Sequence, residues 1–104
     1  MAKPLLGFPG SGQHLHCSLL GKNGNNQFKL RRRKAPPVLR HFIGGLQRYL
    51  AQAFALIAPN VNSYKRFVRG LSAPINLEWG YDNRTTGLRV PFSDPEAGRV
   101  ENRV

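Results

Sequence analysis

Two periodicities in the distribution of apolar and polar residues predict one long helix and four strands. Residues 38–58 have apolar side chains at helical spacing, which predicts an amphipathic helix that ends at Pro59. Apolar and polar residues alternate over residues 13–20, 74–79, 85–91 and 99–104, as is typical of half-buried strands. The order of strand, helix and three further strands predicts an α+β fold.

The segments between these elements have the composition of turns and loops. Residues 21–27, 80–84 and 93–98 contain the glycine, asparagine, aspartate and proline residues that favour turns. Residues 28–37 form a charged segment that Pro36 and Pro37 close, and residues 60–70 are expected to be irregular or briefly helical. Within the predicted helix, Gly44 and Gly45 each weaken the middle by about 1 kcal/mol unless another backbone packs closely there.

Alternation gathers polar side chains on one face of the first and last predicted strands. Since successive side chains of a strand point to opposite faces, residues two apart lie together. The set on the first strand is His14, His16 and Ser18, and the set on the last is Arg99, Glu101 and Arg103. Two rows of chemically active side chains are therefore predicted near the two ends of the chain.

The charge balance indicates a polyanionic partner. Sixteen lysines and arginines against five aspartates and glutamates give the 104 residues a formal net charge of +11. Five of these cations lie in the block KLRRRK at residues 29–34, which is typical of a solvated loop or tail. The later arginines occur singly on patterned segments and are candidates for site residues or surface charges.

Several classes of protein are disfavoured by the composition. No apolar run approaches the roughly 18 residues of a membrane-spanning helix, and the first residues do not resemble a signal peptide, so a cytoplasmic protein is expected. Cys17 is the single cysteine, which excludes an internal disulfide and a zinc site built from cysteines. The GSG at residues 10–12 lacks the lysine of a phosphate-binding P-loop.

The pattern alone leaves the role of the polar rows open. Histidines two apart on a strand suit a metal ion or a phosphate contact, and they are also common at ordinary surface positions. A glutamate between two arginines is compatible with cation and anion binding, and equally with a surface ladder of ion pairs. Arg84 and Arg89 have the guanidinium groups that suit phosphates and carboxylates, or a solvated face.

Four separate stretches together resemble the glutamine synthetase superfamily. They are GSGQHLHCSL, PNVNSYKRFVRG, APINLEWGYDNRTTGLRVP and GRVENRV, in the order and approximate spacing of that family, over residues 9–104. The amino-acid sequence of the third stretch resembles the glutamine-synthetase-like branch of the family, which includes γ-glutamylpolyamine synthetases. The resemblance implies a curved antiparallel sheet that forms part of an active-site funnel, with one long packing helix.

The resemblance also implies a reaction and its partners. The family joins the γ-carboxylate of glutamate to ammonia or an amine through a γ-glutamyl phosphate formed from ATP, with Mg²⁺ or Mn²⁺ ions that neutralise the phosphoryl group. Intact members are homo-oligomeric rings whose active sites lie between subunits. A membrane partner is not implied, and nucleic acid is expected to bind nonspecifically if at all.

Residue by residue, the resemblance assigns roles to ten positions. His14 and Glu101 match metal ligands, while His16, Ser18, Arg89 and Arg99 match positions that contact ATP. Gly10, Arg66 and Arg103 match positions that bind glutamate, and Arg84 and Arg89 match arginines around the phosphates and the γ-carboxylate.

The sequence departs from the family pattern at three places. Pro9 stands where the family has asparagine, Ser72 stands where the housekeeping enzyme has a glutamate that helps to bind ammonium, and residues 29–34 replace a polar or acidic loop. Ser72 argues against ammonia as the best substrate.

Length is the largest difference from the family. Residues 1–104 correspond to part of a catalytic domain, without the small N-terminal β-grasp domain and the closing C-terminal helices. We therefore expect a fragment that is inactive by itself. The alternative interpretation is a basic module that binds nucleic acid, or another partner, through residues 29–34 without catalysis.

Overall fold

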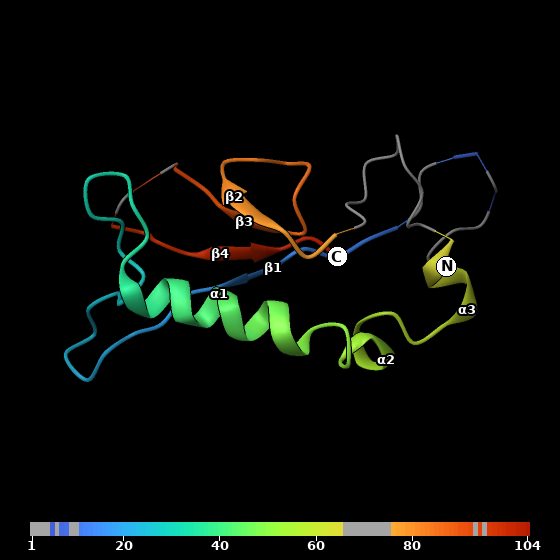
Figure 1. Cartoon of the computed structure of the whole chain (residues 1–104), viewed down its shortest axis with the longest axis horizontal. Helices are drawn as coiled ribbons and strands as arrows, with labels where there is room; N and C mark the ends of the chain where they lie inside the picture. The colour runs from blue at the N-terminus through green and yellow to red at the C-terminus, as the bar shows by residue number, and fades with distance from the viewer. Residues whose placement is uncertain (1–4, 6, 9–10, 66–75, 93, 95) are drawn as a thin grey trace.

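The computed structural model places one helix against one face of a small mixed sheet. It describes residues 5, 7–8, 11–65, 76–92, 94 and 96–104. The helices are α1 (Pro37–Tyr49), α2 (Phe54–Ile57) and α3 (Val61–Tyr64), and the strands are β1 (Leu15–Cys17), β2 (Trp79–Tyr81), β3 (Leu88–Val90) and β4 (Val100–Asn102). Figure 1 shows α1 running alongside the sheet, with α2 and α3 following it. The α+β class predicted from the sequence is confirmed.

The sheet joins the two ends of the described chain. Its strand order is β1-β4-β3-β2, so the first strand pairs with the last. In the antiparallel pair of β1 and β4, His16 lies opposite Glu101, and in the antiparallel pair of β4 and β3, Arg89 lies opposite Glu101. One row across three strands therefore carries His16, Glu101 and Arg89.

The pairing of β2 with β3 is parallel, which corrects the expectation of a purely antiparallel sheet. Because β2 and β3 run in the same direction, residues 82–87 must lead the chain back along β2 before β3 begins. Six extended residues reach about 20 Å, which is more than the length of a three-residue strand. Asp82 starts this return with a φ of 48°. Gly87 completes it, because a Cβ there would lie 1.9 Å from the carbonyl oxygen of Asn76.

The core lies between α1 and the face of the sheet that bears the apolar side chains. Phe28, Leu39 and Ile43 are at most 1% exposed, and so are Leu88 and Val90 of β3 and Val100 of β4. The alternation in β3 and β4 thus matches the prediction: apolar side chains face the helix, and Arg89 and Glu101 face away from it. The polar face of the sheet is free to form a site.

The predicted helix is shorter than expected and is broken. Pro37 occupies its first turn, where the missing amide hydrogen of proline costs nothing, and α1 ends at Tyr49 rather than continuing to residue 58. No glycine or proline lies in residues 50–53. After the break, Leu56 and Ile57 of α2 line the same pocket as the buried Leu50.

The strand bounds also differ from the sequence prediction. The sequence predicts the second strand over residues 74–79, whereas β2 is Trp79–Tyr81, so that Gly80 and Tyr81 belong to β2 rather than to a turn. Residues 66–75 lie outside the described part of the chain, so the start of the predicted strand is not observed. Within the described residues, no helix combines the length and the apolar character that crossing a bilayer requires.

Candidate functional site

Glu101 is the centre of a polar cluster on the face of the sheet opposite α1. Its residue is 3% exposed, and both carboxylate oxygens have partners. Nδ1 of His14 lies 2.8 Å from Oε1 of Glu101, and Nη1 of Arg89 donates a 3.0 Å hydrogen bond to Oε2. A buried carboxylate is stable only with such partners, since burial without them would cost several kcal/mol.

Cross-strand register explains why these side chains meet. His16 and Arg89 are the direct neighbours of Glu101 on β1 and β3, and His14 lies two residues before His16 on the same face. Gly80 is the partner of Arg89 on β2 and contributes no side chain that would cover the guanidinium group. Alternation alone had placed these groups on common faces, and strand pairing brings the faces together.

His16 has a defined tautomer in this cluster. Nε of Arg99 donates a 3.2 Å hydrogen bond to Nδ1 of His16, so Nδ1 acts as the acceptor. In the neutral ring the hydrogen then resides on Nε2, which lies 3.8 Å from Oε1 of Glu101. His16 is therefore arranged to donate a hydrogen bond rather than to offer a lone pair to a metal ion.

Asp82 completes the surroundings of Arg89 and was not singled out from the sequence. Nε and Nη2 of Arg89 both donate to Oδ1 of Asp82, while Nη1 donates to Glu101. The hydrogen bonds with Asp82 are the main reason why the pKa of Arg89 lies above its usual range; burial opposes that rise, and Glu101 adds to it. The one local signal for Asp82 was its place in a predicted turn close to a charged strand.

Charges within the cluster balance. Asp82 and Glu101 supply two negative charges, and Arg89 and Arg99 supply two positive charges. The cluster is therefore suited to hold its own side chains in fixed positions, and it has no excess negative charge to attract a divalent cation on its own.

Arg103, which directly follows β4, is a buried charged residue like Glu101. It is 7% exposed, and its Nε is buried without a hydrogen-bond partner. Removing a guanidinium nitrogen from water without a partner is unfavourable. Arg103 is thus the described residue with the clearest unmet capacity to bind an anion, which is compatible with the carboxylate contact that the resemblance implies.

The remaining predicted site residues are not brought into this cluster. Arg84 and Ser18 are exposed, and neither makes an ion pair or hydrogen bond through its side chain within the described part of the chain. Gly10 and Arg66, and the departures Pro9 and Ser72, lie outside the described residues.

The donor atoms fit one side of a metal site and do not complete one. His14 and Glu101 offer an imidazole nitrogen and a carboxylate oxygen, and a shared cation would replace the hydrogen bond between them. Mg²⁺ prefers about six oxygen ligands. No group of three or more histidine, cysteine, aspartate or glutamate side chains suited to hold a metal ion occurs among the described residues.

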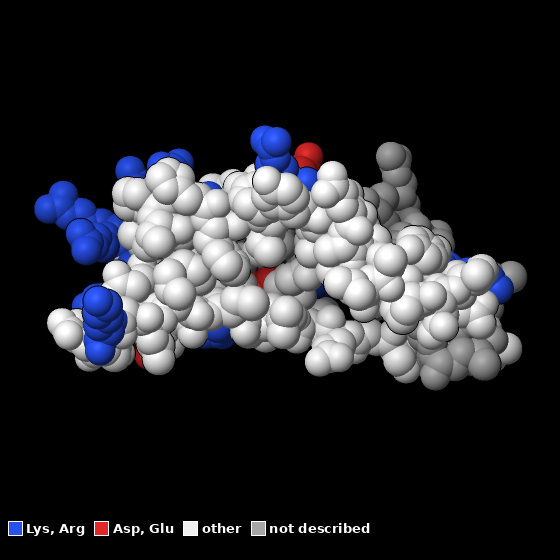
Figure 2. Space-filling view, turned by 90° about the horizontal axis from the view of Figure 1, so that it is seen from below, with Lys and Arg blue, Asp and Glu red and all other residues white. Residues whose placement is uncertain are grey.

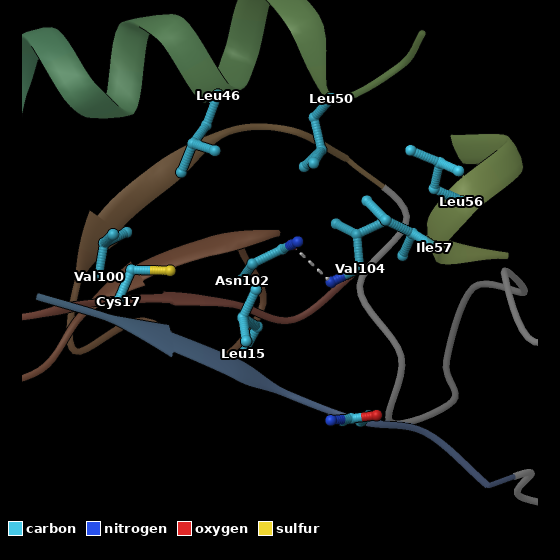
Figure 3. Close-up of a pocket in the computed structure, with 10 residues that line it drawn as sticks. Leu15, Cys17, Leu46, Leu50, Leu56, Ile57, Val100, Asn102 and Val104 are labelled. Carbon is cyan, nitrogen blue, oxygen red and sulfur yellow. Dashed lines mark hydrogen bonds between the residues drawn. The ribbon is translucent and has the colours of Figure 1, made fainter. Parts of the chain in front are cut away.

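The opposite face of the sheet borders an apolar pocket that the sequence did not predict. Its volume is about 340 Å³, and Figure 3 shows Leu46 and Leu50 of α1 reaching toward Cys17 and Val100 of the strands. Leu56 and Ile57 of α2 lie along the same hollow. The sheet therefore separates an apolar pocket from the polar cluster around Glu101.

Comparisons with known proteins give one consistent family. The family model described as "Glutamine synthetase, catalytic domain" matches residues 1–104. The chain is 45% identical over 103 residues to the glutamine synthetase of Pyrococcus woesei, covering 99% of this chain and 23% of the relative. It is 40% identical over 104 residues to the γ-glutamylputrescine synthetase of Escherichia coli K12, covering 100% of this chain and 22% of the relative.

Solved structures resemble the chain in the same way. The glutamine synthetase of Plasmodium falciparum superposes with a TM-score of 0.85 at 28% identity, over 99% of this chain and 21% of that one. A GmaS–ADP complex superposes with a TM-score of 0.76 at 32% identity, over 99% and 25%. The chain thus spans about a fifth to a quarter of the length of these relatives. Relatives of both the glutamine and the γ-glutamylputrescine type match, and their identities do not favour the polyamine branch.

Proposed function

Because the chain belongs to the glutamine synthetase catalytic-domain family, we propose that it carries one wall of an active site that joins glutamate to ammonia or an amine in an ATP-dependent reaction. The supporting observation is the convergence of His14, which directly precedes β1, with Arg89 of β3 and Glu101 of β4. Relatives of this family make glutamine and γ-glutamylputrescine, and one resembles this chain in a complex with ADP.

The described side chains support a division of labour within this wall. Arg89 is positioned by two carboxylates and presents a fixed guanidinium group, which suits the charge of a phosphoryl group or the γ-carboxylate of glutamate. Arg103, with its unpartnered Nε, suits the carboxylate of the amino-acid substrate. Arg99 and His16 form a linked pair that suits contact with the nucleotide.

A divalent cation would be held here by His14 and Glu101 together with ligands from elsewhere. Mg²⁺ or Mn²⁺ would neutralise negative charge on the transferring phosphoryl group. His16 is assigned to hydrogen bonding rather than to the metal, since its Nδ1 already accepts a hydrogen bond from Arg99. With one buried carboxylate and a balanced charge, the 104-residue chain is expected to bind a divalent cation weakly and to form no product by itself.

A transplant tests whether this wall is competent. The chain would replace the matching 103 residues of the Pyrococcus woesei enzyme, and γ-glutamyl product would be measured with ATP, glutamate, Mn²⁺ and ammonia or putrescine. We expect activity in the chimera and a loss of 100-fold or more on Glu101→Gln, because the buried carboxylate is central to the cluster.

His41→Asn is the matched control, since His41 is an exposed histidine of α1 on the other side of the sheet. A folded, oligomeric chimera without any ligase activity would contradict the proposed function. Product formed by the 104-residue chain alone would contradict its expected inactivity. The measured preference between ammonia and putrescine would decide the amine.

A further inference from the structure

Residues 29–34, here called the basic hairpin, form a defined tight turn whose charged side chains are exposed, as expected of a solvated segment. The amide of Arg31 donates to the carbonyl of Lys34 and the amide of Lys34 donates to the carbonyl of Arg31, both at 3.0 Å. Between them, Arg32 and Arg33 have φ angles of 52° and 60°. Two central residues with positive φ are the mark of a type I′ hairpin turn.

Burial of the flanking residues fixes this turn in place. Phe28 and Leu30 on one side and Ala35 on the other are at most 7% exposed and belong to the hydrophobic core. The amide of Ala35 donates a 2.8 Å hydrogen bond to the hydroxyl of Tyr81 on β2. The guanidinium group of Arg33 lies 5.5 Å from the centre of the Phe92 ring, a cation–π contact. The core thus holds the basic hairpin in a fixed position at the surface.

The turn would be more stable with other residues at its tip. Type I′ turns favour Asn-Gly, because a side chain with a Cβ in the left-handed region costs about 1 kcal/mol or more per residue. Arg32 and Arg33 therefore destabilise the turn that presents them. A strained position occupied by charged side chains points to a role for the side chains themselves.

The four cations at the tip have no anionic partner in the described structure. Lys29 pairs with Glu96, whereas no carboxylate of the described residues forms an ion pair with Arg31, Arg32, Arg33 or Lys34, all of which are exposed. All five acidic residues of the chain lie in the described part. Figure 2 shows lysine and arginine side chains projecting at the end of the molecule that carries this turn in Figure 1.

We infer that the basic hairpin binds the phosphate backbone of a nucleic acid duplex, without reading its bases. Four adjacent unpaired cations supply the charge that releases counterions from phosphates. Beside them lies a polar hollow of about 390 Å³, lined by Asn25, Asn26, Gln27, Lys29, Arg31 and Glu96. Amide and cationic side chains are the groups that contact phosphate and sugar oxygens.

A membrane surface suits this hairpin less well. Basic amphipathic segments that anchor to membranes place apolar side chains beside the cations, where they enter the lipid. Here the apolar neighbours Phe28, Leu30 and Ala35 are buried in the core and are not available for insertion. This binding is independent of the proposed ligase site, because the basic hairpin shares no residue with the cluster around Glu101.

The double variant Arg32→Asn/Arg33→Gly tests the inference without breaking the turn. Asn-Gly is the preferred pair of a type I′ turn, so the variant removes two charges and is expected to raise the melting temperature of the full chain. Its binding to a labelled 20-base-pair DNA duplex should fall about tenfold or more in 100 mM NaCl. The slope of log K against log salt should become shallower by about 2, since each phosphate contact contributes about 0.9.

Arg40→Gln/Arg48→Gln is the matched control. It removes two exposed charges from α1 and leaves a good helix former at each position, so DNA binding should change by less than about threefold. Equal losses in both double variants would overturn the inference, because the net charge rather than the hairpin would then bind. Unchanged DNA binding in the hairpin variant would also overturn it, as would retention of the chain on phosphatidylserine vesicles but not on DNA.

Discussion

At the scale of single residues, Asp82 fixes the position of Arg89 within the site. It holds two nitrogens of Arg89 and so leaves one nitrogen for Glu101. The raised pKa of Arg89 means that the stability contributed by protonation of the arginine is fully present below its usual pKa range and is lost as the pH rises through the higher value. The ion pairs of Arg89 therefore add no pH dependence near neutrality through the arginine.

We predict that Asp82→Asn loosens Arg89 while the fold remains. The amide keeps the size of the side chain and one acceptor oxygen but loses the charge that holds the guanidinium group. Hydrogen exchange at Nε of Arg89, followed by NMR, should become faster, and the free energy of unfolding should fall by less than about 1 kcal/mol because the Asp82 side chain is half exposed.

Asp94→Asn is the control for this experiment, because Asp94 is exposed and its carboxylate accepts a hydrogen bond from the nearby amide of Glu96. Its substitution should leave the exchange at Arg89 unchanged. An unaltered exchange rate in the Asp82 variant would show that Glu101 alone positions the guanidinium group.

Individual site residues differ in how far the sequence could indicate them. Alternation placed His14 and His16 on one face, and Arg99 and Glu101 on another, because the two-residue period of a strand is a local property. Their convergence on one carboxylate needed the pairing of β1 with β4 across more than eighty residues. Asp82 lies in a turn, where no periodicity exists to predict the direction of a side chain.

At the scale of elements, two kinds of glycine have opposite roles. Gly44 and Gly45 lie in α1, and no atom of the described residues comes within 4 Å of a Cβ built at either position. The close packing that would offset their cost is therefore not found in the described structure. At Gly98, before β4, a Cβ would lie 2.0 Å from the carbonyl oxygen of Phe28.

We predict that Gly45→Ala and Gly98→Ala change stability in opposite directions. Alanine at position 45 should raise the free energy of unfolding by about 0.5–1 kcal/mol through helix propensity. Alanine at position 98 should lower it by about 1–3 kcal/mol, because the backbone of Phe28 must move and Phe28 is fully buried. Urea denaturation followed by circular dichroism measures both variants, and a stabilising Gly98→Ala would contradict the close approach.

The elements also show where local patterns stop being sufficient. The helix is correctly placed by its apolar spacing, since Leu39, Ile43 and Leu50 are all buried. Its break after Tyr49 has no local signal, because residues 50–53 contain no glycine or proline. The parallel direction of β2 and β3 has no local signal either, since the path of residues 82–87 is set by contacts such as that of Gly87 with Asn76.

At the scale of the whole molecule, the described chain is extended and exposes apolar surface. Its radius of gyration is 14.9 Å, against about 13 Å for a compact chain of this length. Leu15 is 56% exposed on β1, which is an edge strand of the sheet, and Leu56 is 86% exposed beside the same pocket. An apolar hollow next to an open strand edge favours association.

We predict that Leu15→Lys reduces self-association of the chain. A charge at the mouth of the pocket opposes docking of a second apolar surface on the edge strand. Sedimentation velocity at several concentrations should give a smaller mean sedimentation coefficient than for the unchanged chain, together with weaker binding of an apolar fluorescent dye. Leu20→Lys is the control, because Leu20 is similarly exposed but does not line the pocket; an equal effect of both variants would assign the change to net charge alone.

The sequence by itself determined the class of the fold, the helix that covers the sheet, the faces of its strands and, through four quoted stretches, the family. These follow from local periodicity and from short motifs, which are properties of neighbouring residues. Only the tertiary structure decided that Glu101 sits between His14 and Arg89, that Asp82 positions Arg89, and that the basic hairpin is a strained turn fixed by the core. The reason is that strand register, chain return and burial join residues that lie far apart in the sequence, and no local pattern contains that information.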